Sequence, residues 1–384
     1  MGEWKEKEKK FVMQTYKRFD LLIVKGQGEW VWDESGNKYL DCTAGIAVNN
    51  IGHCHPKLVL ALKEQAEKLI HCSNWFYNEL QIELAEKMSQ ITKLEKSFFC
   101  NSGAEAIEGA MKLARKHTGK KEIISMKGAF HGRTMGALAA TWKENYKKPY
   151  KPLVPSIKHA EYGSIEKVKK EVSENTAAII VEPIQGESGI IIPPEGFLKE
   201  VRELCDEKGI LMIVDEIQTG FGRTGKMFAY EYEGIKPDIL CLAKAIAGGL
   251  PMGAVIAREE IGSAFGYGDH GTTFGGSPFI CAGALATLKI IEEEKLVEKS
   301  MSKGKKLKGM LEGLENVEKK KWEVRAKGLL IGVDLGKKEA RIFCEKMLKE
   351  NKVLALPTAE QTVRLVPPLM IDEGNFGMIV KAFE

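Results

Sequence analysis

Residues 210–253 read ILMIVDEIQTGFGRTGKMFAYEYEGIKPDILCLAKAIAGGLPMG, and this stretch decides the fold. It contains two short apolar runs, Ile210–Val214 and Ile239–Ala243, whose length and β-branched residues are typical of buried strands. Asp215 directly follows the first run, and Lys244 directly follows the second. In an open α/β sheet, ligands bind in the crevice beyond the carboxyl ends of the strands. The stretch therefore predicts a carboxylate and a lysine at the ligand-binding edge of such a sheet.

Lys244 has the surroundings of a reactive amine. Small residues flank it and two glycines follow, so a flat carbonyl compound can approach the amine and form an imine. A partly desolvated lysine is also a better nucleophile, because burial disfavours its charged form. Pyridoxal phosphate needs such a lysine and an acid that keeps its pyridine nitrogen protonated, and Asp215 would be that acid. Taken singly, each residue has a simpler interpretation, Asp215 as a turn cap and Lys244 as a solvated surface lysine.

The loop GFGRTG at residues 220–225 suggests a different class of protein. It fits the dinucleotide-binding pattern G-x-G-x-x-G, and with Lys226 it fits the first part of a phosphate-binding P-loop. Met227 follows, however, where a P-loop needs a hydroxyl to hold magnesium. The next residues also show no helical apolar stripe that begins at the glycines. A nucleotide-binding enzyme that uses this loop is therefore a distant alternative.

A third predicted strand end offers a seat for a phosphate. Residues 97–100 are predicted to form a short strand that leads through Ser102 into a helix over residues 106–117. The start of a helix presents free N–H groups and a positive dipole end, which favour anions. By itself the motif is weak, because a serine cap followed by Glu105 is also an ordinary helix start.

Two more predicted strands end in residues suited to binding a substrate. The strand over residues 122–126 is followed by KGAFHGRT, in which Phe130 can stack on a flat ring. The planar guanidinium of Arg133 suits a bidentate grip on a carboxylate. The strand over residues 177–181 ends in EPIQGESG, which brings Glu187 to the same edge of the sheet. Outside this context, Arg133 would be interpreted as a surface arginine.

Together these motifs resemble those of the class III pyridoxal-phosphate aminotransferases, from about residue 19 to residue 369. VDEIQTGFGRTG and the Lys244 segment resemble the class signature. GIAVN-x-x-GH-x-HP is similar to the acetylornithine subgroup rather than the ornithine subgroup, which carries a tyrosine near Ile46. The resemblance implies an α/β protein of the aspartate-aminotransferase-like fold type I. A large, mainly parallel seven-stranded sheet domain would be joined by a smaller α+β domain from both termini. The expected parts are residues 1–50 (N-terminal segment), 51–280 (large cofactor-binding domain) and 281–384 (C-terminal small domain).

The resemblance also implies roles for individual residues. Lys244 and Asp215 would be catalytic. Residues that would bind the cofactor are Ser102, Gly103, Ala104, Phe130, Asp215, Gln218, Lys244 and Thr273. Residues that would bind the substrate are Arg133, Glu187, Thr272 and Arg364. Glu187 would pair with Arg364 and mask it while an amine-bearing donor is bound. In the family the threonine pair comes from the neighbouring subunit, which implies a homodimer with shared active sites.

The implied reaction moves the terminal amino group of N2-acetyl-L-ornithine to 2-oxoglutarate in arginine biosynthesis. Other donors stay open, namely free ornithine, 4-aminobutyrate and a blocked lysine of lysine biosynthesis. Glutamate-1-semialdehyde aminomutase is disfavoured because it needs no residue such as Arg364 to bind 2-oxoglutarate. A non-catalytic descendant is disfavoured because Asp215, Gln218 and Lys244 are all present. Assembly beyond a dimer also stays open.

Composition argues against several other classes. The 57 basic and 53 acidic residues are mixed along the chain, which disfavours nucleic-acid binding. The eight cysteines have no metal-ligand spacing, so we expect reduced thiols and no metal site. His53 and His55 lack an evident third ligand and are expected to be structural. The charged N-terminus and the absence of a long apolar run predict a soluble cytoplasmic protein without a membrane partner. The family would lead us to expect a slightly longer C-terminal helix.

Overall fold

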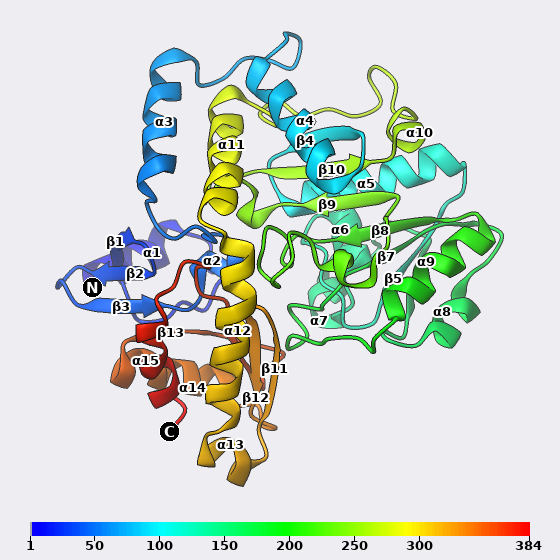
Figure 1. The fold of residues 1–384 in the computed structure, drawn as a ribbon. Coiled ribbons are helices and arrows are strands. Elements are labelled where there is room, and N and C mark those ends of the chain that lie inside the picture. The colour runs from blue at the N-terminus through cyan, green and yellow to red at the C-terminus, as the bar shows by residue number, and fades with distance from the viewer. Residues whose placement is uncertain (1) are drawn as a thin grey trace.

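The computed structural model describes residues 2–384, and within this range seven strands form the central sheet (Figure 1). Their order is β4-β10-β9-β8-β7-β5-β6. The bounds are β4 Lys96–Cys100, β5 Glu122–Met126, β6 Ile157–Ala160, β7 Thr176–Val181, β8 Leu211–Asp215, β9 Ile239–Leu242 and β10 Gly253–Ala257. Only β10 runs antiparallel to its neighbours, β4 and β9. The predicted α/β fold with a mainly parallel seven-stranded sheet is confirmed.

Helices cover both faces of this sheet. Along β8, Met212 and Val214 belong to the apolar core on one face, and Leu211 and Ile213 belong to the core on the other face. Because both faces are buried, these strands are apolar along their whole length instead of alternating with polar residues. Two helices pack on the face of Met212, α4 (Glu79–Thr92) and α9 (Phe197–Lys208), and two on the opposite face, α5 (Gly103–Thr118) and α6 (Met135–Ala140).

The two ends of the chain build a second, smaller lobe (Figure 1). One four-stranded sheet has the order β1-β2-β3-β13, and the other has the order β11-β12-β15-β14. β13, near the C-terminus, pairs in parallel with β3, near the N-terminus. The bounds are β1 Ile23–Gln27, β2 Trp30–Asp33, β3 Lys38–Asp41, β11 Glu323–Lys327, β12 Leu330–Asp334, β13 Val353–Leu354, β14 Leu356–Thr358 and β15 Thr362–Leu365. The predicted α+β domain from both termini is therefore present.

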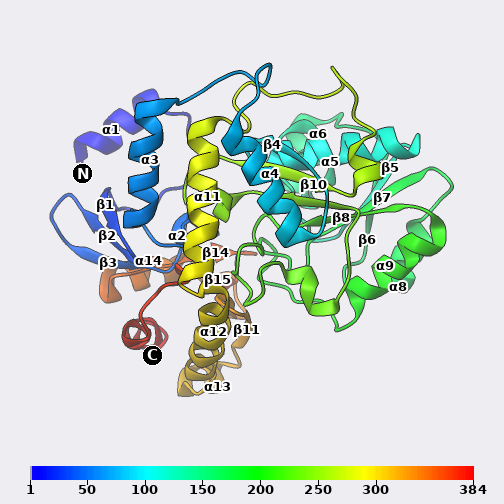
Figure 2. The same ribbon diagram turned by 45° about the horizontal axis from the view of Figure 1, so that its top comes forward.

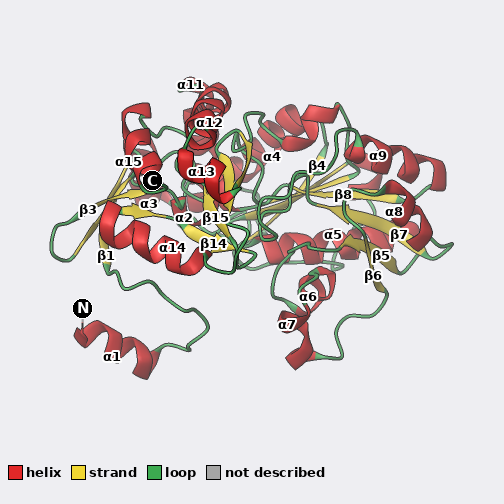
Figure 3. Cartoon of the chain, turned by 90° about the horizontal axis from the view of Figure 1, so that it is seen from below, coloured by secondary structure: helices red, strands yellow, loops and turns green. Residues whose placement is uncertain are grey.

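Helices α3 (Pro56–Lys68) and α11 (Pro278–Glu293) pack side by side (Figure 2). α11 runs through residue 280, one of the two expected boundaries between the parts of the chain. The expected division at residues 50 and 280 stays a prediction. α1 has no buried residue and projects from the body of the protein (Figure 3). The other α-helices are α1 Gly2–Phe11, α2 Ala44–Ala47, α7 Glu144–Lys147, α8 Ile165–Glu171, α10 Glu259–Gly262, α12 Leu296–Glu312, α13 Glu315–Lys320, α14 Ala340–Lys346 and α15 Phe376–Lys381.

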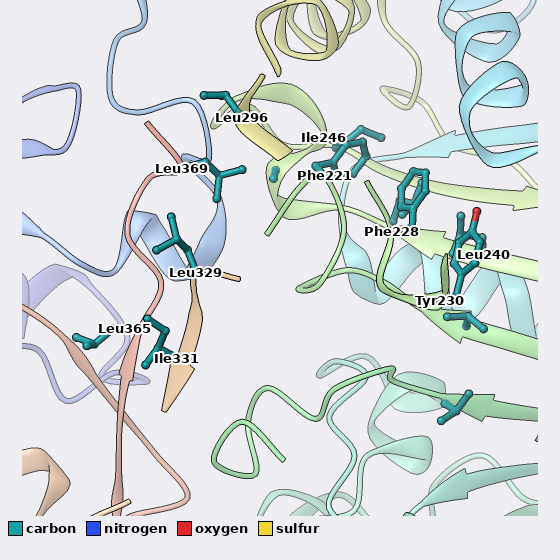
Figure 4. Packing of buried hydrophobic residues seen from close by; sticks show 14 of the residues in the cluster. Phe221, Phe228, Tyr230, Leu240, Ile246, Leu296, Leu329, Ile331, Leu365 and Leu369 are labelled. Atoms are coloured by element: carbon teal, nitrogen blue, oxygen red, sulfur yellow. The ribbon is translucent and has the colours of Figure 1, made fainter. Parts of the chain in front are cut away.

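One apolar core joins the two lobes. Figure 4 shows Phe221 and Phe228, from the loop after β8, in the same buried cluster as Leu329 and Leu369 of the smaller lobe. Gly222 lies so close to this lobe that a Cβ atom there would be 3.0 Å from the Leu369 side chain. The loop GFGRTG is therefore a packed contact between the lobes.

Arg223, within this loop, is fully buried. Its guanidinium donates hydrogen bonds to the carbonyl oxygens of Leu329 at 3.0 Å and Pro367 at 2.6 Å, and to the Asn50 side-chain oxygen at 2.6 Å. Among the described residues, no carboxylate forms an ion pair with it. Burial lowers the pKa of Arg223 to about 9. The arginine connects three separate parts of the chain, which is a structural use of the loop and not phosphate binding.

We expect Arg223→Met to lower the free energy of unfolding by about 2–5 kcal/mol, because buried oxygens of Pro367 and Asn50 lose their donor. Urea unfolding at a fixed protein concentration measures the change. Lys226→Met, at an exposed position three residues later, is the control and should shift stability by less than about 0.5 kcal/mol. Equal destabilisation by the two substitutions would contradict this role for Arg223.

Candidate active site

A cavity of about 390 Å³ lies beyond the carboxyl ends of the parallel strands. The loops after five strands contribute to its wall, so residues that are far apart in the sequence meet there. The lining residues that concern us are Ser102, Gly103 and Ala104 after β4, Phe130 and His131 after β5, Glu182 after β7, Asp215 and Gln218 after β8, and Lys244 after β9. The structure thus brings together seven of the residues predicted from the sequence to bind the cofactor.

The amine of Lys244 is unpaired in this cavity. No hydrogen bond or ion pair to it occurs within residues 2–384. Burial lowers the pKa of Lys244, opposed by the negative charge of Glu187 and reinforced by the positive charge of Arg364. Lys244 also has a left-handed backbone φ of 47°, which is uncommon for a residue with a side chain and occurs often at functional sites. A lowered pKa increases the fraction of neutral amine, the form that acts as a nucleophile or base.

Asp215 forms a buried pair with His131. The Asp215 Oδ2 atom lies 2.7 Å from His131 Nδ1, and the amide of Ile217 donates to Asp215 Oδ1 at 3.0 Å. Burial acts to lower the pKa of His131, but the hydrogen bond and charge of Asp215 outweigh it, so the pKa is raised. The imidazole therefore donates to the carboxylate and fixes its orientation. Sequence reasoning missed this role of His131, whose only signal was its place beside Phe130 in the AFHGR segment.

The first turn of α5 forms one end of the cavity. Ser102 is the N-cap, and its hydroxyl accepts a hydrogen bond from the Glu105 amide at 3.2 Å. The amides of Gly103 and Ala104 lie in the first turn, where N–H groups have no intrahelical partner and the helix dipole is positive. A Cβ atom at Gly103 would lie 2.8 Å from Ile217, so a larger side chain would be crowded there. This end of the cavity suits a phosphate group.

These features fit pyridoxal phosphate. The unpaired amine of Lys244 can react with an aldehyde, and the turn that begins α5 can hold a phosphate. Between them, the Phe130 ring and the buried Asp215 carboxylate line the wall. A flat pyridine ring with an aldehyde and a phosphate therefore matches the groups that the cavity presents.

Arg364 and Glu187 form an ion pair next to Gln218. Arg364, on β15, is buried and donates to a carboxylate oxygen of Glu187 and, at 3.1 Å, to the side-chain oxygen of Gln218. Burial acts to raise the pKa of Glu187, but the charge and hydrogen bond of Arg364 outweigh it, so the pKa is lowered. A Cβ atom at Gly186 would lie 2.5 Å from Gln218, so the absence of a side chain there makes room for this group. The structure thus pairs the two residues expected to meet.

Five of the predicted site residues are not among the described residues that line this cavity. They are the paired Glu187 and Arg364, and Arg133, Thr272 and Thr273. Arg133 is exposed and stacks on the Tyr146 ring. Thr272 and Thr273 line a separate cavity of about 920 Å³, where the Asn101 side-chain amide donates to the Thr272 hydroxyl at 3.1 Å. Their expected contributions to a neighbouring subunit's site therefore stay predictions.

Other sequence predictions concern metals, thiols and membranes. His53 Nε2 lies 2.7 Å from an oxygen of Asp41, and His55 Nε2 lies 2.9 Å from an oxygen of Glu294, which fits structural roles for both. Residues 2–384 contain no group of three or more His, Cys, Asp or Glu residues that could hold a metal ion. All eight cysteines are free thiols, and Cys54 is the exposed one. No helix in this range has the length and apolar character needed to cross a membrane.

Known proteins are similar to this chain over nearly its whole length. The family model of class-III aminotransferases matches residues 11–384. The acetylornithine aminotransferase of Methanopyrus kandleri is 51% identical over 368 residues, which cover 95% of this chain and 94% of that protein. The one from Methanosarcina acetivorans is 50% identical over 387 residues, with 99% and 95% coverage.

Solved structures of similar proteins share the whole fold. The acetylornithine aminotransferase from Elizabethkingia anophelis matches with a TM-score of 0.88 and 36% identity, covering 100% of this chain and 97% of that one. The ornithine aminotransferase from Toxoplasma gondii matches with a TM-score of 0.95 and 33% identity, with 100% and 94% coverage. In the Toxoplasma structure PLP partially occupies the active site.

Proposed function

Since this chain belongs to the class-III aminotransferases, we propose that it transfers the terminal amino group of N2-acetyl-L-ornithine to 2-oxoglutarate with pyridoxal 5'-phosphate as cofactor. One observation carries this proposal. In a single cavity, the unpaired amine of Lys244, the buried Asp215–His131 pair and the first turn of α5 converge. About half of the residues are identical to those of acetylornithine aminotransferases over nearly the whole chain. The reaction would belong to arginine biosynthesis.

When bound, pyridoxal phosphate supplies an aldehyde that reacts with amines and a protonated ring that draws electrons from the reacting carbon. Lys244 would hold the cofactor in the resting enzyme. Its neutral amine would then take a proton from the amine-bearing carbon of the donor and deliver it to the cofactor. Asp215 would hold a proton on the ring nitrogen, and its pairing with His131 keeps the carboxylate oriented.

Glu187 would control which substrate Arg364 meets. While the positively charged donor enters, the ion pair with Glu187 neutralises Arg364 and removes a repulsive charge from the site. When 2-oxoglutarate enters, its carboxylate can replace that of Glu187 as the partner of Arg364.

We also propose that two copies of the chain share their active sites. Several large apolar side chains are strongly exposed near the loop that carries Thr272 and Thr273. They are Trp75, Phe76, Tyr77, Tyr267 and Phe274. Large exposed apolar patches usually mark interfaces, and the threonines could then reach the phosphate of a partner subunit. Light scattering should give twice the mass of the chain, whereas a monomer with full activity would contradict this arrangement. We further propose that the protein is located in the cytoplasm.

The visible spectrum of the cofactor-loaded protein tests the function. We expect a yellow protein whose absorbance is bleached fastest by N2-acetyl-L-ornithine, compared at equal concentrations with free ornithine, 4-aminobutyrate and N2-acetyl-L-lysine. Faster bleaching by one of the other donors would keep the chemistry and overturn the substrate. A protein that gains no visible absorbance with pyridoxal phosphate would overturn the cofactor as well.

A further inference from the structure

Arg133 is held in place by stacking alone. Its guanidinium carbon lies 3.7 Å from the centroid of the Tyr146 ring and 5.7 Å from that of the Phe130 ring. The side chain is exposed, and across residues 2–384 it makes no hydrogen bond and no ion pair. An arginine in water has many accessible rotamers, so the closest contact decides where the charge points. That contact is the face of Tyr146.

The Tyr146 ring is itself fixed against the wall of the active site. It is half-buried and meets the Phe130 ring edge to face, with centroids 6.4 Å apart and planes at 85°. The segment that carries Tyr146 is anchored because the Trp142 amide donates to the Ala129 carbonyl oxygen at 2.8 Å. The Lys143 ammonium also lies 5.2 Å from the Tyr146 ring centroid. The ring therefore connects two cations at the surface to an aromatic residue of the cavity.

A second cavity, of about 650 Å³, lies on the other side of a shared residue, Phe130. Phe130 lines both cavities, and Tyr146 and Glu187 line the second. A donor whose terminal amine reaches Lys244 would extend past Phe130 from the first cavity toward the second, and Tyr146 lines the second.

We propose that Tyr146 is a positioning residue that directs the Arg133 guanidinium toward the α-carboxylate of the amino donor. This role rests on the proposed function, because it assumes a donor with a carboxylate far from the reacting amine. A guanidinium that is already oriented loses less freedom when the carboxylate binds, and the affinity rises accordingly. The ring has no part in proton transfer at Lys244. Its loss should weaken binding of the donor and leave the chemical step intact.

Two substitutions separate the aromatic face from simple bulk. In Tyr146→Leu, which keeps an apolar side chain without a π face, the KM for N2-acetyl-L-ornithine should rise by about three- to thirty-fold. The kcat should stay within about twofold of the wild-type value. Tyr146→Phe keeps the ring and should restore a KM near that of the wild type. Tyr146→Met replaces the leucine variant if that variant does not fold.

A double-mutant cycle tests whether Tyr146 acts through Arg133. In an Arg133→Gln background, Tyr146→Leu should raise KM no further, since the charge that the ring positions is gone. N-(4-aminobutyl)acetamide has the same amine and acetamide but no carboxylate, and its KM should not respond to Tyr146→Leu. Calorimetry with the unreactive analogue N2-acetyl-L-norvaline should show the same loss of affinity as the KM, without any turnover.

The outcomes separate this proposal from the proposed function. An unchanged KM in Tyr146→Leu, an equal rise in the Arg133→Gln background, or an equal rise for N-(4-aminobutyl)acetamide would each overturn the role of Tyr146. A wild-type protein that does not react with N2-acetyl-L-ornithine would overturn the proposed substrate instead, before any variant is compared.

Discussion

Replacing Lys244 with alanine is expected to lower kcat by about 10⁴-fold or more, because one side chain supplies both the attachment for the cofactor and the base for proton transfer. Among the described residues, the carboxylates that line the cavity are already engaged. Of the other groups that line the cavity, the Asp215 carboxylate is engaged by His131, and Glu182 accepts hydrogen bonds from the amides of Phe130 at 3.1 Å and Gly186 at 3.4 Å. The loss should therefore appear in kcat and not only in the affinity for cofactor.

Two measurements define this outcome. Turnover of N2-acetyl-L-ornithine gives the rate, and the visible spectrum shows whether cofactor added to Lys244→Ala keeps the absorbance of the free aldehyde. Lys226→Ala, an exposed lysine from the same stretch of sequence, is the matched control and should keep the wild-type rate and spectrum. Activity in Lys244→Ala above a few per cent of wild type would mean that another residue is the base.

The strands that lead to the active site could be predicted from the sequence because both of their faces are buried in apolar surroundings. Runs such as the one that became β8 are apolar throughout, since helices cover both faces of the sheet, and this pattern depends only on local sequence. The polar residue at the end of each run then marks the ligand-binding edge. Asp215 and Lys244 were found in this way. The antiparallel direction of β10 was not foreseen, because an apolar run carries no information about which strands become its neighbours.

The pairs that give the site its electrostatics depend on distant parts of the chain. His131 and Asp215 are 84 residues apart, and Glu187 and Arg364 are 177 residues apart. The second pair was expected only through the family resemblance, and the first was missed. Local sequence predicts which residue lies at the end of a strand. The order of the strands in the sheet determines which distant residues that side chain contacts.

The GFGRTG loop also shows that a local sequence pattern alone does not determine function. Its letters fit a phosphate-binding motif, but the fold buries Arg223 among carbonyl oxygens from residues 329 and 367. Those oxygens belong to the backbone, so the residue types in the sequence do not predict these hydrogen bonds. The role of the loop is determined by the lobe that packs against it.

Asp215→Asn is expected to lower kcat by about 10²–10⁴-fold, because a neutral amide cannot hold the positive charge on the ring nitrogen. The substitution keeps the size of the side chain and its acceptor for the Ile217 amide, so cofactor should still bind through Lys244 and the turn that begins α5. The His131 pKa should fall at the same time, since the charge of Asp215, which raises that pKa against the effect of burial, is lost.

Glu216→Gln provides the comparison that isolates this electrostatic role. Glu216 is the next residue, is equally buried and does not line the cavity within the described residues. Its carboxylate accepts a hydrogen bond from the Tyr230 amide at 2.8 Å, and burial raises its pKa to about 7. Neutralising Glu216 should therefore change stability but leave kcat and the spectrum close to wild type. If the two variants lost activity equally while cofactor content was unchanged, Asp215 would act through packing. A loss confined to Asp215→Asn, with the cofactor bound and its spectrum altered, would identify the charge itself as the cause.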